Sequence, residues 1–239
     1  MTRFDFHVHT ALSACAEDIM SPRQILSRAR TAGLQVLALT DHNASAHLAP
    51  ALELAGEFGV TVIPGIEVTS REEVHLLALF AAPEALADFQ ALIDASLPVE
   101  ENVSAVFGEQ VVYNARDEIV DVDNRLRQVG TALGLAQLVQ EIRGRQGVVI
   151  PAHVFRNRYS LISQLGFIDP ASGFDALELQ WRQWRREHHR RGDRLDGFPL
   201  LTGSDAHFLE DVGRAYIEIE ETTADLRRIM QALQIGNGL

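Results

Sequence analysis

Five short apolar segments of this chain end in histidine or in an acidic residue, and this recurrence constrains the fold more than any other feature. The first segment ends in two histidines that are separated by one residue, His7 and His9. The other four end at Thr40-Asp41-His42, Gly65-Ile66-Glu67, Pro151-Ala152-His153 and Ser204-Asp205-Ala206-His207. Parallel α/β folds carry their functional residues at the carboxyl ends of the strands. The pattern therefore predicts that these side chains meet at one rim of such a fold.

The segments between these endings predict strands that alternate with helices. Ser21, Pro22 and Gln24 form a capping-box helix start, and Gly33 suits the left-handed residue that ends this helix. The apolar runs are continuous rather than alternating, which indicates strands buried on both faces. We therefore expect parallel βα units, the run 74–80 included, in an α/β barrel of about seven or eight strands.

The alternation breaks between about residues 97 and 131. Segments 109–114 and 117–122 predict two strands of a hairpin around Ala115-Arg116. We interpret 98–131 as an insertion within a single domain that spans residues 1–239, because no linker composition appears. The insertion is either a lid or a contact in a homo-oligomer. A plain surface hairpin is an equal alternative, since long loops cost little entropy.

The composition narrows the class of protein. The chain has 33 acidic and 21 basic residues, a net charge of −12, which argues against stable binding of a nucleic-acid duplex. Its single cysteine, Cys15, excludes an internal disulfide framework and fits a reducing compartment. No run approaches the roughly 18 apolar residues of a membrane span, and residues 1–12 lack the apolar core of a secretory signal. We expect a cytoplasmic protein without a membrane partner.

The convergence of imidazoles and carboxylates predicts a metal centre. Each motif alone could be a helix cap or a surface group, but five strands that end alike favour shared coordination. Imidazole and carboxylate without thiolate suit zinc, manganese or iron. The candidate ligands exceed the needs of one ion, so we expect two or three divalent ions. A hydroxide that bridges such ions can attack a phosphate ester in line.

Together these motifs resemble those of the PHP (polymerase and histidinol phosphatase) family of metal-dependent phosphoesterases. The segments that carry the resemblance are His7-Val8-His9-Thr10, Thr40-Asp41-His42-Asn43, Gly65-Ile66-Glu67, Pro151-Ala152-His153 and Gly203-Ser204-Asp205-Ala206-His207. The resemblance implies a distorted (β/α)7, TIM-like barrel that holds up to three divalent ions. It carries the metal ligands of the family onto His7, His9, Glu17, His42, Glu67, His75, His153, Asp205 and His207.

Two of these ligand assignments leave alternatives. Glu17 is chosen over its neighbour Asp18 as the acidic residue of the first loop, and Cys15 in the same loop is interpreted as a packed or solvent-side thiol. His75 opens an apolar run, so a core residue is the alternative to a ligand. Glu178 also ends a predicted strand and receives no role.

The resemblance also identifies residues that would act on the substrate. Arg156 lies three residues after His153, where similar phosphomonoesterases carry an arginine, and a planar guanidinium fits two phosphate oxygens. Arg158 is the second candidate, and a solvated loop arginine is the alternative for either. Asp41 is expected to steady His42 or to move a proton.

The sequence therefore predicts a hydrolase of the EC 3.1 type. Its substrate would be a small phosphomonoester, a nucleotide or a short oligonucleotide. One alternative is a metallohydrolase of the same fold that acts on an amide or cyclic substrate, because fold does not fix function. Another is a non-catalytic regulatory module. His47 and the pair His188-His189 are interpreted as solvated residues outside the site.

Overall fold

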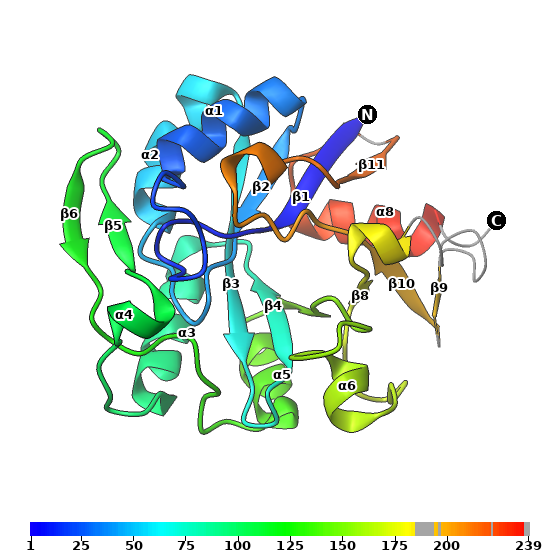
Figure 1. Cartoon of the computed structure of the whole chain (residues 1–239). Coiled ribbons are helices and arrows are strands. Elements are labelled where there is room, and N and C mark those ends of the chain that lie inside the picture. The colour runs from blue at the N-terminus through cyan, green and yellow to red at the C-terminus, as the bar shows by residue number, and fades with distance from the viewer. Residues whose placement is uncertain (185–193, 196, 221, 237–239) are drawn as a thin grey trace.

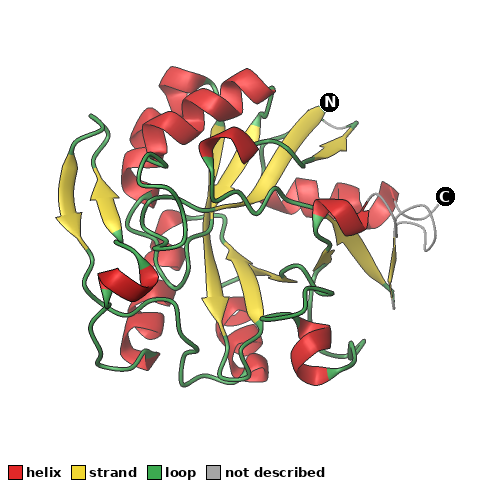
Figure 2. Cartoon of the chain, viewed as in Figure 1, coloured by secondary structure: helices red, strands yellow, loops and turns green. Residues whose placement is uncertain are grey.

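A curled mixed sheet organises the chain, with helices around it (Figures 1 and 2). The computed structural model describes residues 1–184, 194–195, 197–220 and 222–236. Its strands are β1 (Thr2–Val8), β2 (Val36–Leu39), β3 (Thr61–Thr69), β4 (His75–Leu79), β5 (Val111–Tyr113), β6 (Ile119–Val122), β7 (Val148–Pro151), β8 (Leu177–Glu178), β9 (Arg194–Leu195), β10 (Phe198–Leu201) and β11 (Ile217–Ile219). Its helices are α1 (Pro22–Ala32), α2 (Leu48–Phe58), α3 (Pro83–Ser96), α4 (Ser104–Phe107), α5 (Leu135–Gly144), α6 (Leu161–Leu165), the 3-10 turn η1 (Leu209–Asp211) and α8 (Leu226–Gly236).

The strand order explains why the loops meet. The main sheet runs β11-β1-β2-β3-β4-β7, and a second sheet runs β8-β10-β9. Strands β1, β2 and β3 are parallel to one another, as are β8 and β10. The backbone N–H of Asp175 donates to the carbonyl of Val149, which joins the approach to β8 to strand β7. The two sheets form a half-barrel, so the expected α/β, TIM-like fold is confirmed in its distorted form.

Strand β4 departs from the expected parallel arrangement. It pairs antiparallel with both β3 and β7, so the prediction of another parallel strand over 74–80 is wrong. The cause is a tight turn in which Ser70 donates to the carbonyl of Val74 and Glu73 adopts φ +59°. A parallel crossover needs a dozen or more residues. The antiparallel turn places the start of β4 beside the end of β3, where Glu67 lies.

Helix α1 begins after Ser21 as predicted, but within the described residues the Gln24 side chain donates to Asp117 and does not close the predicted capping box. The Ser21 side chain accepts a hydrogen bond from the backbone of Gln24, and Gly33 ends the helix at φ +77°. Helix α2 begins at Leu48 and is ended by Gly59, which adopts φ +65°. The residue before it, His47, is fully buried, so the expectation of a solvated side chain is wrong there. The pair His188-His189 lies outside the described residues.

The predicted hairpin insertion is present and is fastened to the rest of the chain. Strands β5 and β6 pair antiparallel and lie on the same side of the molecule as α2 (Figure 1). At the turn of the hairpin, Asp117 accepts hydrogen bonds from Ser21 and from Gln24. Further along, Asn43 donates its side-chain amide to the carbonyl of Arg127 at 2.7 Å. The insertion thus contacts both α1 and the loop that follows β2.

None of the helices in the described ranges combines the length and the apolar character that crossing a bilayer requires.

Candidate metal centre

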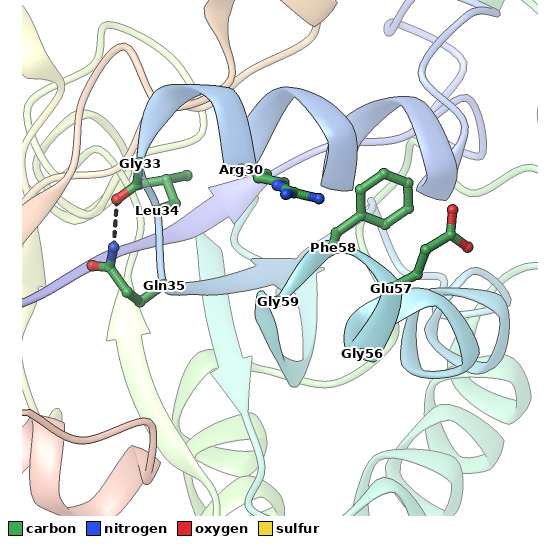
Figure 3. A pocket seen from close by; sticks show the side chains of 8 residues that line it. All are labelled: Arg30, Gly33, Leu34, Gln35, Gly56, Glu57, Phe58 and Gly59. Carbon is green, nitrogen blue, oxygen red and sulfur yellow. Dashed lines mark hydrogen bonds between the residues drawn. The ribbon is translucent and has the colours of Figure 1, made fainter.

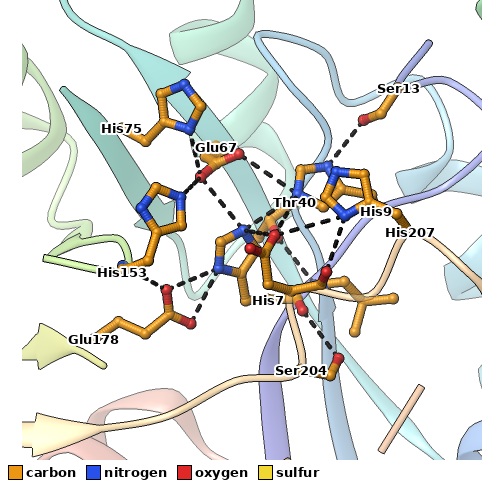
Figure 4. A network of polar contacts seen from close by, with 12 residues as sticks. His7, His9, Ser13, Thr40, Glu67, His75, His153, Glu178, Ser204 and His207 are labelled. Atoms are coloured by element: carbon orange, nitrogen blue, oxygen red, sulfur yellow. Dashed lines mark hydrogen bonds and ion pairs between the residues drawn. The ribbon is translucent and has the colours of Figure 1, made fainter. Parts of the chain in front are cut away.

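The polar strand ends converge in one buried cluster (Figure 4). Parallel bridges between adjacent strand ends bring the loops together, one between Val8 and Ala206 and one between His42 and Glu67. His75 comes from the start of β4, and the loop after β7 brings His153. We call the following set the metal-site cluster: His7, His9, His42, Glu67, His75, His153, Asp205 and His207.

Glu67 lies at the centre of the cluster and is completely buried. Five imidazoles approach its carboxylate from the ends of four strands, two of them from β1, and Figure 4 shows several of them pointing at it. The distances from the imidazole nitrogens to Glu67 oxygens are 2.8 Å for His42, 2.9 Å for His75, 3.3 Å for His7 and for His153, and 3.5 Å for His9. One carboxylate surrounded in this way suits a group that bridges cations.

Asp205 supplies the second carboxylate, from the loop after β10. Its Oδ1 lies 3.3 Å from Nε2 of His7 and 3.4 Å from Nε2 of His9. Its Oδ2 lies 3.6 Å from Nη1 of Arg156. Asp205 therefore lies between the imidazoles and Arg156, the residue predicted to bind the substrate.

In the part of the chain that the structure describes, three sets of side chains have ligand atoms within 4.8 Å of one another, close enough to share an ion. They are His9 with His42 and His207, His7 with His9 and Glu67, and His42 with Glu67 and His75. The sets share members, as expected where neighbouring ions have common ligands. The ring nitrogens of the buried His153 make no hydrogen bond of good geometry within the described residues, although Nε2 faces Oε1 of Glu67 at 3.3 Å. Buried polar atoms are rarely left without a partner, so this ring suits a bound cation.

The electrostatics favour the ligating forms of several groups. Burial opposes ionisation of Glu67 and Asp205, but the surrounding imidazoles hold the pKa of both carboxyls well below its usual range. Burial, together with the neighbouring His207 and His42, lowers the pKa of His9 well below its usual value. Carboxylates and a neutral imidazole are the forms that bind metal.

Two other histidines are basic instead. Burial works against protonation of His7, but the carboxylates of Glu178, Asp205 and Glu67 raise its pKa well above the usual value. Glu67 in the same way raises the pKa of His42 to about 10, against the effect of burial. Protons on these rings carry positive charge between the carboxylates. Divalent cations at the same place would replace those protons, and binding would release them.

Glu178 is a supporting residue to which the sequence gave no role. Its two carboxylate oxygens lie 3.0 and 2.9 Å from Nδ1 of His7 (Figure 4), and one of them accepts the backbone N–H of His153. A carboxylate behind a metal-ligating histidine typically fixes the ring orientation and the tautomer. Glu178 thus keeps the proton of His7 on Nδ1 and leaves Nε2 facing Glu67 and Asp205.

The first loop brings Cys15 beside the cluster, although the residue is exposed. Partial desolvation raises the pKa of the Cys15 thiol, but hydrogen bonds with His207 and His42 outweigh it and lower the pKa to about 6. Glu17 is also exposed, and its carboxylate accepts the backbone N–H of Leu209 at 3.4 Å. Within the described residues neither Cys15 nor Glu17 belongs to the three ligand sets, so the assignment of Glu17 stays a prediction.

The carboxylate of Asp41 hydrogen-bonds to the first loop, and within the described residues it makes no hydrogen bond to the ring of His42. The carboxylate accepts hydrogen bonds from the backbone and the hydroxyl of Thr10, at 2.7 and 2.8 Å, and from the hydroxyl of Ser13 at 2.6 Å. Ser13 in turn lies 3.0 Å from Nδ1 of His9. Asp41 therefore supports the loop that carries His9.

Both candidate substrate arginines line one pocket next to the cluster. Arg156 reaches the cluster through its contact with Asp205, and 41% of its side chain is exposed. The ring of Tyr159 stacks on that of His75 with a centroid distance of 4.9 Å. The pocket is lined by Phe155, Arg156, Asn157, Arg158, Tyr159, Gln180 and Gln183. A group bound to the cluster can therefore extend into a polar pocket with two guanidiniums.

A second pocket, the amino-end pocket, lies at the opposite ends of the strands (Figure 3). Residues 34–35 and 59 in it precede β2 and β3, and helices α1 and α2 end beside it. Its lining residues are Arg30, Gly33, Leu34, Gln35, Gly56, Glu57, Phe58 and Gly59. None of the ligand sets found in the described ranges includes any of them.

A half-barrel with imidazoles and carboxylates clustered at its strand ends defines the class as an α/β barrel protein with a candidate metal centre. The model for the PHP domain matches residues 5–102, and the model described as PHP-associated matches residues 194–237. The chain thus carries a PHP domain with a PHP-associated C-terminal region. The resemblance stated from the sequence motifs is confirmed.

Curated relatives match part of the chain. A 5'-3' exoribonuclease of Haemophilus influenzae is 32% identical over 80 residues, which are 32% of this chain and 28% of the relative. A phosphoribosyl 1,2-cyclic phosphate 1,2-diphosphodiesterase of Eggerthella lenta is 36% identical over 80 residues, 31% of this chain and 29% of the relative. A 3',5'-nucleoside bisphosphate phosphatase of Chromobacterium violaceum is 31% identical over 86 residues, which are 35% of this chain and 29% of the relative. The matches span less than a third of the length of these three relatives.

Solved structures match nearly the whole chain in fold. The lesion-specific endonuclease PfuEndoQ of Pyrococcus furiosus has a TM-score of 0.68 at 19% identity, over 99% of this chain and 56% of the other. An amidohydrolase of Chromobacterium violaceum, with bound sulfate, has a TM-score of 0.58 at 20% identity, over 96% of each chain. At these identities the likeness establishes the fold alone.

Proposed function

We propose that this protein is a metal-dependent phosphoesterase of the EC 3.1 type that hydrolyses a small phosphomonoester, a nucleotide or a short oligonucleotide. The observation that carries the proposal is the buried carboxylate of Glu67 within 3.5 Å of five imidazoles, with Asp205 linking them to Arg156. The names of the three curated relatives describe cleavage of phosphate esters, which supports the same reaction type.

The metal-site cluster would hold two or three divalent ions of zinc, manganese or iron, since it offers nitrogen and oxygen donors in overlapping sets. When bound, such ions lower the pKa of water and offset the charge that develops on a phosphate. Glu178 keeps Nε2 of His7 free to coordinate by holding the proton on Nδ1. Ser13 does the same for His9.

Arg156 would bind and orient the phosphate. Its planar fork can donate to two phosphate oxygens, and its contact with Asp205 directs it toward the cluster. Arg158, exposed in the adjoining pocket, can bind a second anionic group of the substrate. In the hydrolysis, water adds to phosphorus, the bond to the ester oxygen breaks, and the leaving oxygen takes up a proton.

The test uses p-nitrophenyl phosphate and Mn²⁺ with His9→Ala and Asp205→Ala. Each substitution removes a ligand, so we expect turnover to fall by at least about 100-fold. Arg156→Ala should chiefly raise the KM, because it removes a phosphate contact. Unchanged turnover in the two ligand variants would contradict the proposal, and a panel of monoesters, diesters and amides would then define the true substrate class.

A further inference from the structure

One buried histidine outside the metal-site cluster connects the insertion to that cluster. His47 immediately precedes α2, is 0% exposed, and its side chain makes no helix-capping hydrogen bond. Its Nε2 accepts the backbone N–H of Tyr113, on strand β5, at 2.8 Å. Its Nδ1 lies 2.6 Å from Oγ1 of Thr10, in the loop after β1. Both ring nitrogens are therefore used, and they join segments that are far apart in the sequence.

The direction of these hydrogen bonds follows from the donors. A backbone N–H can only donate, so Nε2 of His47 must be the acceptor, and the neutral ring carries its proton on Nδ1. That proton is donated to Oγ1 of Thr10. The Thr10 hydroxyl then has its own proton free for Oδ2 of Asp41, 2.8 Å away. Burial lowers the pKa of His47, which is consistent with the neutral ring.

The same assignment of donors and acceptors can be continued as far as the metal-site cluster. Oδ1 of Asp41 accepts the hydroxyl proton of Ser13 at 2.6 Å. With that proton committed, the Ser13 oxygen accepts from the backbone of His42 at 3.2 Å and from Nδ1 of His9 at 3.0 Å. His9 is thus protonated on Nδ1, and its Nε2 faces Glu67 and Asp205.

We propose that His47 is a positioning residue through which the insertion holds Thr10 and Asp41 in place, so that Asp41 and Ser13 keep His9 in its ligating tautomer and orientation. The inference rests on the proposal that His9 binds metal. It gives the insertion a role that neither a lid nor a plain surface hairpin implies, because the contact is made by its backbone deep in the fold. A residue that merely filled space at position 47 would not need two oriented ring nitrogens.

The experiment compares His47→Phe, which keeps the ring volume and removes both nitrogens, with His47→Gln, which can still donate and accept. Chelator-treated full-length protein is titrated with Zn²⁺ or Mn²⁺ alone, at a temperature where circular dichroism shows each variant folded. We expect His47→Phe to lose about 10- to 100-fold in metal affinity, as for other residues that orient a ligand. His47→Gln should recover most of this loss.

Leu54→Ala is the matched control, because Leu54 is a buried apolar residue of α2 outside the hydrogen-bonded chain. It should lower the melting temperature and leave the metal affinity of the folded protein unchanged. If His47→Phe behaves like Leu54→Ala, His47 has only a packing role and the inference is wrong. If the unmutated protein binds no metal, the proposed function itself fails, so the two failures are distinguishable.

Discussion

The two ends of the parallel strands differ in kind. At the carboxyl ends, buried ionisable groups from distant segments surround Glu67, and their pKa values are displaced in opposite directions (Figure 4). At the amino ends, the amino-end pocket is lined by backbone, by apolar groups, by Gln35 and by the charged side chains of Arg30 and Glu57 (Figure 3). Glu57 is exposed and paired with Arg23. A surface pocket is therefore a weaker sign of function than a cluster of buried ionisable groups with displaced pKa values.

The strongest test of this comparison is to replace a glutamate by glutamine at each end of the strands. Glu67→Gln removes the central charge of the metal-site cluster, so metal affinity should fall by at least about 100-fold. Glu57→Gln in the amino-end pocket should change it by less than about twofold, because exposed ion pairs contribute little. Calorimetric titration with Mn²⁺ measures both. Equal losses in the two variants would abolish the distinction.

Glu178→Gln should have the next largest effect. Its carboxylate contacts Nδ1 of His7 with both oxygens, and an amide cannot accept the proton as well. Metal affinity should drop by about 10-fold or more but less than in Glu67→Gln, since no direct ligand is lost. Competition with a fluorescent chelator would measure this, and a loss larger than that of Glu67→Gln would contradict the assigned order.

A smaller effect is expected from pH in the metal-free protein. Burial depresses the folded-state pKa of His47, although the facing Asp41 raises it, and the backbone of Tyr113 occupies Nε2. Below pH 6.5 the unfolded chain takes up a proton that the folded ring refuses, so stability falls as pH falls. This contribution to stability is present above pH 6.5 and diminishes as the pH falls below it. Urea unfolding of His47→Gln should show a correspondingly shallower loss between pH 7.5 and 5.5.

The smallest effect is expected from a substitution in the amino-end pocket. Gly33 ends α1 in the left-handed conformation at φ +77°, which a side chain disfavours by about 1 kcal/mol. Gly33→Ala should lower the melting temperature by a few degrees and leave metal affinity unchanged. A change in metal affinity would show that the two ends of the strands are coupled.

The convergence of the strand-end side chains could be predicted from the sequence because parallel strands bring their carboxyl ends together. His7, His42 and Glu67 each lie at the end of an apolar run, and the parallel arrangement of these strands brings the three side chains to the same edge of the sheet. Glu178 lies 171 residues from His7, and only the fold reveals their contact.

The loops and turns were harder to predict. The position of Cys15 depends on an irregular loop, and the burial of His47 depends on a hairpin 66 residues away. The reversal of β4 followed from a turn too short for a crossover, which the apolar pattern of the strand does not encode.

The most direct test is the number of divalent ions that the full-length protein binds. Metal-free protein titrated with Mn²⁺ or Zn²⁺ should bind two or three ions per chain, release protons as it does so, and lose this binding in Glu67→Gln but not in Glu57→Gln. Failure to bind any ion tightly, or binding that survives the loss of Glu67, would contradict the account.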